Sequence, residues 1–411
     1  MSALPESPSI LSFEDARHVV EEQAAGLAPR GKESIDLLHA FGRVLAESLI
    51  ADRDFPAFPR ATRDGYAVRS ADLKQVPSSL NVIGEIKAGV LPKDLPVKLN
   101  SGEAVAIMTG APVPPCADSV VMVEYTTPSG NRVEISRRVN SGENVVASGA
   151  EARRGDVLLQ PGIRLHAAAI AIAASVGKTK LGVYLRPQVA VLSTGDEVVD
   201  IHLQPGPNQI RNSNSYSLAA QIIAAGADPV LLPVAPDEPA RLKELIVQGL
   251  QSDLLLLTGG VSMGKYDLVE QVLATMKAQF FFTGAQIQPG KPIVFGRVAG
   301  KYFFGLPGNP VSTMVTFELF AKPVIEALGG MSPQKLVFVH ARLKAEVKTK
   351  TGLKRFLPAV LSGEFEKAEV ELVRWQGSGD IAATARSNCY IVIPPDRERI
   401  AAGEWVPVLM R

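Results

Sequence analysis

Four consecutive leucines, Leu254–Leu257, place the strongest constraint on how this chain folds. Such a run is typical of a strand that is buried on both faces, as the central strands of parallel sheets are. A glycine-rich turn follows it, and a new helix is predicted from Tyr266. Glycines permit positive φ and a close approach of ligand to backbone, and a helix start presents unpaired amides. We therefore expect a phosphate or oxyanion site; a tight turn without a ligand is the alternative.

Composition narrows the class of protein. The 411 residues exceed what one core usually organises, so two to four domains are expected. Lys and Arg number 43 against 42 Asp and Glu, which favours a soluble globular protein over a nucleic-acid binder. The only cysteines, Cys116 and Cys389, form no disulfide framework and fit a reducing cytoplasm. No signal peptide or membrane span is expected, because the most apolar long run, 167–176, is too short to cross a bilayer.

The region from Pro187 to Gly330 alternates between strand and helix patterns, which predicts a doubly wound α/β domain. Such domains bind ligands beyond the carboxyl ends of their strands. The expected strands are 189–193, 230–234, 254–257 and 302–305, and the expected helices lie near 214–225, 242–250 and 311–319.

The remaining segments suggest three further domains. Helices are expected at Ser12–Gln23, where Ser12 and Asp15 form an N-terminal cap, and at Glu33–Leu49. Short β runs fill 81–148, helical composition returns at 165–175, and alternating runs after Ser332 predict a small barrel or sandwich. The predicted domains are a helical and linker domain (1–50 with 150–186), a β-rich insertion (51–149), the α/β domain (187–330) and a C-terminal β-barrel (331–411).

Three loops leave the carboxyl ends of the predicted parallel strands, at 193–197, 258–262 and 306–310. Because these ends meet at one edge of a doubly wound sheet, we expect the loops to converge on one crevice. Asn309 is a suitable helix N-cap, and Pro310 suits the first helical position.

Acidic residues accompany these loops, and two readings of them stay open. Carboxylates beside a phosphate cradle make sense when Mg²⁺ lies between them. In the alternative reading, Asp237 caps the next helix and Asp267 is a first-turn charge on its helix. The five histidines are scattered, so no zinc site is expected, and neither a nucleophile elbow nor an ordinary P-loop is present.

Two turns in the β-rich insertion also stand out. Arg63–Ala67 places Asp64 before a glycine and a tyrosine, and Met108–Pro112 places Thr109 at another glycine turn. Plain β-turns are the structural alternative for both.

Taken together, these motifs resemble the molybdopterin molybdenumtransferase family, which includes the E domain of gephyrin. The likeness covers nearly the whole chain. Its motifs, in order, are Asp64-Gly-Tyr-Ala-Val, Ile107-Met-Thr-Gly-Ala-Pro-Val-Pro, Ala117-Asp-Ser-Val-Val with Glu124, Ser193-Thr-Gly-Asp-Glu, 210–214, Thr258-Gly-Gly-Val-Ser, Pro289-Gly-Lys-Pro, Gly305-Leu-Pro-Gly-Asn-Pro-Val-Ser and Gln376-Gly-Ser-Gly.

The resemblance implies an elongated homodimer of four-domain subunits whose α/β domain binds molybdopterin. Members of the family bind adenylylated molybdopterin and molybdate with Mg²⁺, hydrolyse the phosphoanhydride, release AMP and leave molybdenum on the dithiolene. Molybdate is thus a substrate, and a molybdopterin adenylyltransferase is a candidate partner. The family's cleft lies between the α/β domain of one subunit and the β insertion of the other.

The resemblance also suggests roles for individual residues. Asp64 and Thr109 would reach across the dimer, and Glu197, Asp237 and Asp267 would hold Mg²⁺ or orient the attacking oxygen. Pterin phosphate and nucleotide would be bound by the glycine loops. The full substrate-binding set is Thr258, Gly259, Gly260, Ser262, Lys291, Pro307, Gly308, Asn309, Pro310 and Ser378.

This chain departs from the family pattern where positive charge is expected. Gln288 and Leu353 stand where the family commonly has basic residues, and we expect Lys291, Lys354 and Arg355 to substitute for them. Arg63 replaces a usual Met and either adds charge at the site or pairs with Asp64, and Cys116 replaces a usual Gly. A catalytically weak or inactive paralogue that serves as a dimeric scaffold is therefore the alternative function. An enzyme of the same fold that uses tungstate is a third.

Overall fold

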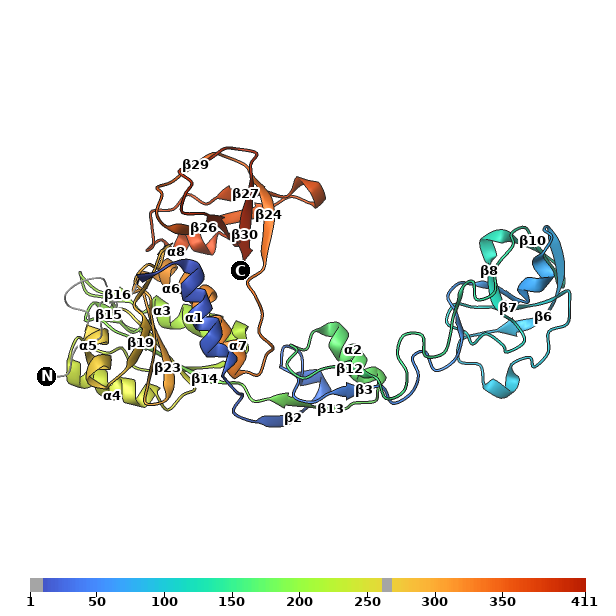
Figure 1. Cartoon of the computed structure of the whole chain (residues 1–411), viewed down its shortest axis with the longest axis horizontal. Coiled ribbons are helices and arrows are strands. Elements are labelled where there is room, and N and C mark those ends of the chain that lie inside the picture. Colours follow the sequence, from blue (N-terminus) through green and yellow to red (C-terminus); the bar gives the residue numbers. More distant parts are fainter. Residues whose placement is uncertain (1–9, 261–267) are drawn as a thin grey trace. The chain divides into compact units, whose positions relative to one another are not determined.

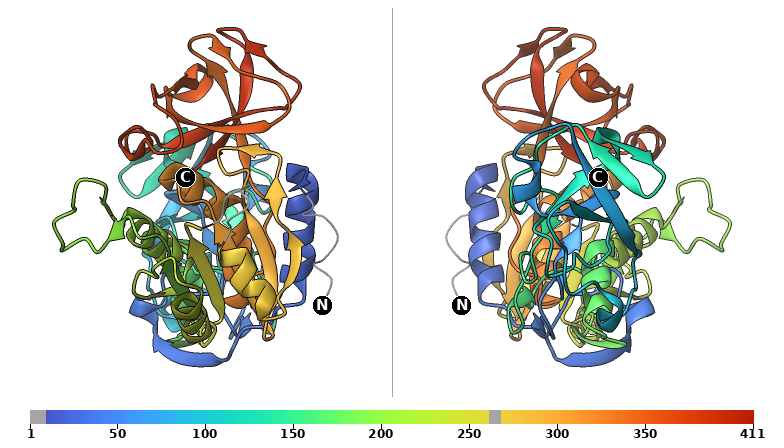
Figure 2. Two further views of the ribbon diagram at one scale, coloured as in Figure 1. Left: turned by 90° about the vertical axis from the view of Figure 1, so that its left-hand side faces the viewer. Right: turned by 90° about the vertical axis from the view of Figure 1, so that its right-hand side faces the viewer.

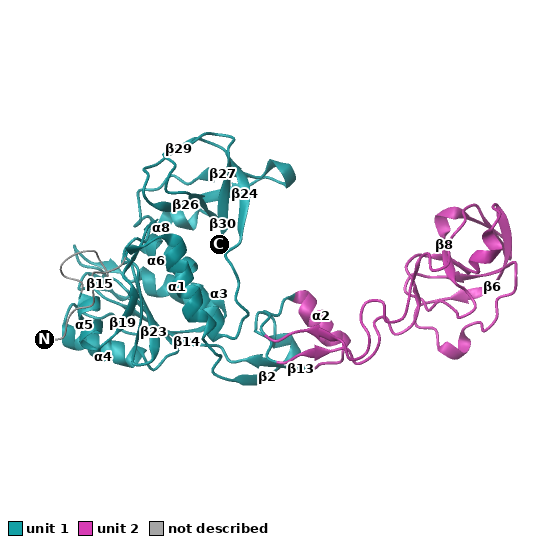
Figure 3. Ribbon diagram, viewed as in Figure 1, with its two compact units in different colours: residues 1–46, 162–166, 180–411 teal, residues 47–161, 167–179 magenta. Residues whose placement is uncertain are grey.

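The computed structural model describes residues 10–260 and 268–411, which form two compact units (Figures 1 and 3). Unit 1 comprises residues 1–46, 162–166 and 180–411, and unit 2 comprises residues 47–161 and 167–179. Among the described residues, no helix combines the length and apolarity needed to cross a bilayer.

A six-stranded sheet forms the centre of unit 1, and the four-leucine strand lies inside it. Four strands are parallel, and two antiparallel strands that the sequence pattern did not predict extend one edge. The strand order is β17 (Asp228–Leu231), β14 (Gln188–Ser193), β18 (Leu254–Thr258), β23 (Lys301–Leu306), β22 (Val294–Val298) and β19 (Gln279–Phe282).

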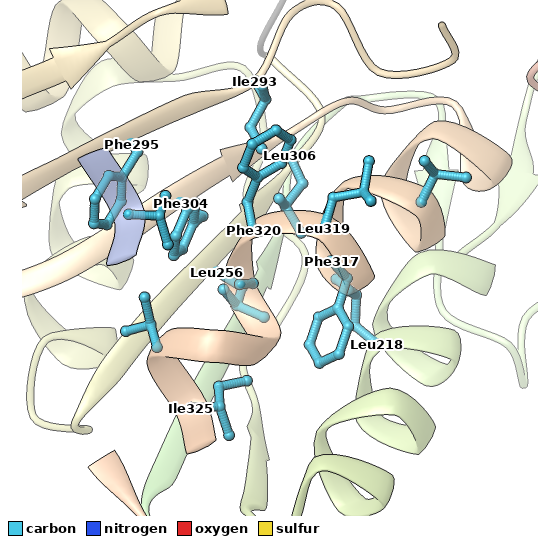
Figure 4. Packing of buried hydrophobic residues seen from close by; sticks show 14 of the residues in the cluster. Leu218, Leu256, Ile293, Phe295, Phe304, Leu306, Phe317, Leu319, Phe320 and Ile325 are labelled. Atoms are coloured by element: carbon cyan, nitrogen blue, oxygen red, sulfur yellow. The ribbon is translucent and has the colours of Figure 1, made fainter. Parts of the chain in front are cut away.

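Helices cover both faces of this sheet (Figure 1). Leu254 and Leu256 contribute to one hydrophobic cluster and Leu255 and Leu257 to another, so all four leucines are buried. Figure 4 shows Leu256 packed with Leu218, Phe304 and Phe317 in the first cluster. The first face carries α1 (Phe13–Ala25), α3 (Ser213–Ala225), α6 (Pro310–Thr316) and α7 (Lys322–Leu328), and the second carries α4 (Pro239–Gly249) and α5 (Leu268–Thr275).

The C-terminal region of unit 1 is a closed five-stranded β-barrel, because β26 pairs with β28 as well as with β27. A sixth short strand, β21 (Ile287–Gln288), joins the barrel to the α/β domain by pairing with the start of β26. Phe13 of α1 packs against Phe356 of the barrel at 5.2 Å between ring centroids. The barrel strands are β24 (Phe338–Leu343), β26 (Lys354–Ser362), β27 (Glu369–Leu372), β28 (Cys389–Ile393) and β30 (Trp405–Met410), with α8 (Ile381–Ala385) between β27 and β28.

The prediction of a helix at Glu33–Leu49 is wrong. This segment contains β2 (Lys32–Asp36), a 3₁₀ turn at Leu37–His39 and Gly42 with φ of +76°. Pairing of β2 with β13 (Lys180–Tyr184) sets Ile35 opposite the buried Leu181, and this long-range contact overrides local helix propensity.

Unit 2 is β-rich, as predicted, and its main sheet has hydrophobic clusters on both faces. Val105 and Val120 face one cluster, and Ala104 and Val121 face the other. The strand order is β8 (Ser119–Met122), β5 (Gly65–Val68), β7 (Glu103–Ile107), β6 (Ser78–Ile86), β10 (Arg132–Ile135) and β9 (Thr126–Ser129). The remaining elements are β3 (Leu49–Ile50), β4 (Arg60–Ala61), β11 (Val145–Val146), β12 (Val157–Leu159) and α2 (Ala167–Ser175).

Candidate functional site

The three loops predicted to converge do meet at one cleft in unit 1. It has a volume of about 710 Å³ and lies at the carboxyl ends of β14, β18 and β23, as a doubly wound sheet requires. Of the predicted site residues, those that line it are Glu197, Thr258, Gly259, Gly260, Pro307, Gly308, Asn309 and Pro310.

The glycines bring two of these loops into direct contact. Gly259 and Gly260 have φ of +90° and +60°, which side chains other than glycine rarely adopt. A Cβ atom on Gly259 would lie 2.5 Å from the carbonyl oxygen of Thr194, and one on Gly260 would lie 2.9 Å from the Thr194 hydroxyl. Close packing against Thr194 is therefore a structural reason for both glycines, in addition to any ligand.

Asn214, on α3, ties the strand end of β18 to the loop after β23. Its Nδ2 atom donates to Thr258 Oγ1 at 2.9 Å and to the carbonyl oxygen of Gly308 at 2.8 Å. The Thr258 hydroxyl donates in turn to the Pro307 carbonyl at 3.2 Å. The predicted ligand Thr258 thus lines the cleft with its hydroxyl already engaged in holding the two loops together.

A buried polar network supports this wall of the cleft, and the sequence analysis missed it. Asn212 is the N-cap of α3 and accepts from the Ser215 amide at 3.0 Å, and Ser193 bonds to both side chains. All three residues are buried. The sequence Asn-Ser-Asn-Ser at the start of a helix, with Asn212 at the N-cap, is the signal that could have revealed it.

Two buried polar atoms of the cleft residues lack a hydrogen-bond partner within the described part of the chain. They are Thr194 Oγ1 and Asn214 Oδ1. Buried polar atoms are nearly always paired, so these two leave hydrogen-bonding capacity for a polar ligand at the cleft.

Asn309 occupies the N-cap position of α6 and Pro310 follows it, as predicted. The Asn309 side chain makes no capping hydrogen bond, and the residue lines both the first cleft and a second hollow. The Val311 amide donates to the Ser378 carbonyl at 2.9 Å, which joins this helix start to the C-terminal region.

The second hollow, of about 510 Å³, shares Pro292, Pro307 and Asn309 with the first. Its described lining includes Lys291, Lys350 and Arg355 and no acidic residue. Neither lysine forms an ion pair within the described part of the chain. The predicted ligands Lys291 and Ser378 both lie here, so the hollow has the character of an anion site.

Of the three cations expected to replace the missing basic residues, Lys291 lines the second hollow, whereas the side chains of Arg355 and Lys354 are held by contacts within the protein. Arg355 is buried and donates through Nε and Nη2 to the Lys350 carbonyl at 3.2 and 2.6 Å. Lys354 pairs with Glu14, lies over the Phe13 ring and lines a different hollow. Lys350, which the sequence analysis did not name, supplies positive charge beside Gln288 and Leu353 instead.

Carboxylates gather beside the first cleft. The Asp237 amide donates to Asp196 Oδ1 at 3.1 Å. Burial, followed by repulsion from Asp196 and Glu197, raises the pKa of Asp237 above its usual value. Glu238, rather than Asp237, occupies the N-cap of α4, so the capping alternative for Asp237 is wrong. No group of three His, Cys, Asp or Glu side chains within residues 10–260 and 268–411 is arranged as a metal site.

Asp64 and Thr109 contact each other in unit 2. Asp64 Oδ1 accepts from the Thr109 amide at 2.6 Å and from its hydroxyl at 2.8 Å, and these bonds lower the pKa of Asp64. Both residues are exposed, and Arg63 forms no ion pair within the described residues. Ser262 and Asp267, by contrast, lie outside the described residues.

Comparison with known families accounts for nearly the whole chain. Residues 11–177 match the profile of the MoeA N-terminal region (domain I and II), residues 190–327 match a probable molybdopterin binding domain, and residues 340–410 match the MoeA C-terminal region (domain IV).

Individual relatives are similar over most of their length. The molybdopterin molybdenumtransferase of Nostoc sp. is 38% identical over 92% of this chain and 88% of its own, and that of Haemophilus influenzae is 33% identical over 97% and 98%. Among solved structures, a molybdopterin biosynthesis moeA protein from Pyrococcus horikoshii OT3 superposes with a TM-score of 0.77 at 28% identity, covering 98% of this chain and 100% of that one. The chain belongs to the molybdopterin molybdenumtransferase family.

Proposed function

We propose that this protein inserts molybdenum from molybdate into adenylylated molybdopterin, with hydrolysis of the phosphoanhydride and release of AMP. Family membership supports the proposal. The observation that carries it is the pair of adjoining hollows. The first is lined mainly by loop backbone and neutral polar side chains, with Glu197 and Arg211 as the charged residues among those described, and the second carries Lys291, Lys350 and Arg355. This division suits a nucleotide-linked organic substrate and a small oxyanion that must react with each other.

We assign the pterin phosphate and nucleotide to the first hollow. The loops at Gly259, Gly260 and Gly308 give a ligand access to the backbone, and Thr194 and Asn214 each have a buried polar atom there without a partner among the described residues. Phosphoanhydride cleavage spreads charge over the phosphoryl oxygens, so positioned donors stabilise the transition state without a covalent nucleophile.

We assign molybdate to the second hollow, beside Lys291, Lys350 and Ser378. The ammonium groups would hold the oxyanion against the dithiolene end of the pterin. Because Arg355 fixes the Lys350 backbone, the loop that carries this lysine is already held in place before any ligand binds.

Mg²⁺ is the metal that this donor set fits. Repulsion among Asp237, Asp196 and Glu197 is the kind that a cation relieves, and Mg²⁺ commonly binds one or two carboxylates together with substrate phosphates. Glu197 and Asp237 would hold it, with Asp267 as the third proposed ligand. The bound ion would supply positive charge to the phosphates.

We infer a homodimer in which Asp64 and Thr109 of one subunit complete the cleft of the other. A cytoplasmic location and delivery of the substrate by a molybdopterin adenylyltransferase are consistent with this chemistry.

The decisive experiment measures AMP release from adenylylated molybdopterin by the purified protein, with and without molybdate and Mg²⁺. We expect release that needs both ions and yields active cofactor. Release without cofactor formation, or none at all, would contradict the proposal.

The neutral residues Gln288 and Leu353 in the second hollow favour one alternative, a cofactor-binding scaffold with little turnover. Tight pterin binding without AMP release would support that function. The variant Leu353→Arg distinguishes the two further. If the site is an active molybdate site, the added charge should tighten molybdate binding by about tenfold, because a charge-assisted hydrogen bond contributes about 1.5 kcal/mol or more.

A further inference from the structure

Arg211 lines the first hollow, and the roles proposed above do not include it. It ends β16 (Ile210–Arg211), which pairs in parallel with β15 (Val198–Val199) directly after the loop that carries Glu197. Among the described residues that line this hollow, Arg211 is the only Lys or Arg. Glu197 lines the same hollow and would repel an anionic substrate, so a compensating cation matters here.

The guanidinium of Arg211 is only partly used by the protein. Its Nε atom donates to the Leu203 carbonyl at 3.1 Å and its Nη2 atom to Gln204 Oε1 at 3.3 Å. The exposed side chain forms no ion pair with a carboxylate in the described part of the chain, and Nη1 has no partner there. The buried Arg355 differs, because it donates twice to one carbonyl and is enclosed.

The loop that holds Arg211 is an ordered structure of its own. Residues 200–209 extend from the α/β domain, as Figure 2 shows, and return to it at β16. Two backbone hydrogen bonds close its base. The Ile210 amide donates to the Glu197 carbonyl and the Asn212 amide donates to the Val199 carbonyl, both at 2.8 Å. Near its tip the Gly206 amide donates to Gln209 Oε1 at 3.1 Å. Arg211 is therefore oriented before a ligand arrives.

We infer that Arg211 binds a phosphate group of the nucleotide-linked substrate in the first hollow, separately from the oxyanion held by Lys291 and Lys350 in the second. This inference rests on the proposed function and deepens it. A guanidinium matches phosphate geometry, is always charged and is more weakly hydrated than an ammonium, so it suits this role at a partly open site. The two hollows thus discriminate between two anions of different size and shape.

The test is a pair of titrations of the full-length protein, with inorganic pyrophosphate and with molybdate, on matched variants. Arg211→Gln should weaken pyrophosphate binding at least tenfold and leave molybdate binding unchanged. Lys350→Gln should do the reverse. Arg211→Lys should restore part of the pyrophosphate affinity. Arg241→Gln, which removes an exposed arginine paired with Glu244 on α4, should change neither.

Wild-type pyrophosphate affinity in Arg211→Gln would overturn the inference, as would an equal loss for both anions or a wild-type protein that does not bind pyrophosphate. The thermal midpoint of each variant shows that it is folded. Molybdate-dependent AMP release by the unsubstituted protein judges the proposed function separately, so that function can stand when the role of Arg211 fails.

Discussion

Gly259 and Gly300 have similar positive φ angles but different surroundings. Their φ angles are +90° and +80°. A side chain at Gly259 would meet the Thr194 carbonyl, whereas a Cβ on Gly300, in the turn between β22 and β23, would meet no atom within 4 Å. Comparing the two positions separates the cost of positive φ from the cost of a close approach between loops.

Gly300→Ala should lower the free energy of unfolding by about 1–2 kcal/mol, because of the positive φ alone. We expect Gly259→Ala to lower it by more. At Gly259 the loop must also move away from Thr194, so pyrophosphate affinity should fall as well. Urea unfolding and pyrophosphate titration measure the two effects. Equal costs at both positions, with unchanged affinity, would show that the close approach is unimportant.

The raised pKa of Asp237 predicts a pH-dependent stability with a definite sign. Between the ordinary value of 3.8 and the raised folded value, the native state binds more protons than the unfolded state. The free energy of unfolding therefore falls as pH rises through that window, and it stays reduced at pH 7 because Asp237 is ionised there in both states. Asp237→Asn should unfold at a higher temperature than the wild type at pH 7, and the difference should vanish below about pH 3.8.

The response of the thermal midpoint to Mg²⁺ tests whether Asp237 is a ligand of the metal. If Glu197 and Asp237 hold Mg²⁺, adding it at pH 7 should raise the thermal midpoint of the wild type, and chelation should reverse the gain. Asp237→Asn should respond far less. Asp228→Asn, at an exposed carboxylate that pairs with Arg186, is the control and should respond as the wild type does. A magnesium response that survives in Asp237→Asn would remove this residue from the proposed site.

At the scale of elements, α3 organises the cleft from its first turn and is held in place at its other end. Asn212 and Asn214 at its start hold the loops that follow β14, β18 and β23. At its end Gly226 adopts φ of +91°, and Arg164 donates to the Ala224 and Ala225 carbonyls. The helix is thus held at both ends, and its start connects the loops.

Asn214→Ala should cost about 0.5–1.5 kcal/mol of unfolding free energy for each hydrogen bond lost, because it removes the donor to Thr258 Oγ1 and to the exposed Gly308 carbonyl. Substrate affinity should also fall as the loop at 306–310 loosens. Asn208→Ala, in the exposed loop before β16, is the matched control and should be nearly neutral. Chemical denaturation and pyrophosphate titration of both variants measure this, and equal behaviour would show that Asn214 does not organise the cleft.

At the scale of the whole molecule, the chain passes four times between its two units, after residues 46, 161, 166 and 179. The β-rich insertion proposed at 51–149 carries two hydrophobic clusters of its own, one on each face of its sheet. A domain with its own core should fold alone. We expect an isolated 51–149 fragment to unfold cooperatively in urea with a β-type circular dichroism spectrum; a non-cooperative transition would show that it needs the rest of the chain.

The sequence patterns that predicted structure correctly were those in which nearby residues alone determine the conformation and the buried face. The four leucines, the strand and helix alternation after Pro187 and the cap at Ser12 each reflect contacts that any neighbour of the right kind satisfies. The prediction for 33–49 failed, and strands β19 and β22 were missed, because pairing with a distant strand determines those conformations.

The same division holds for the site. Glycine turns at the ends of buried parallel strands were enough to predict where the cleft lies, since the carboxyl ends of such strands share one edge. Which cations line the two hollows without an internal partner did not follow from the residue types, since Lys354, Arg355 and Lys350 lie close together in sequence. In the folded chain Lys354 pairs with Glu14, and Arg355 lines the second hollow but donates to the Lys350 carbonyl. Lys350 and Arg211 line the second and the first hollow, and neither forms an ion pair in the described part of the chain. A charged side chain's direction depends on long-range packing and pairing, and these exist only once the chain has folded.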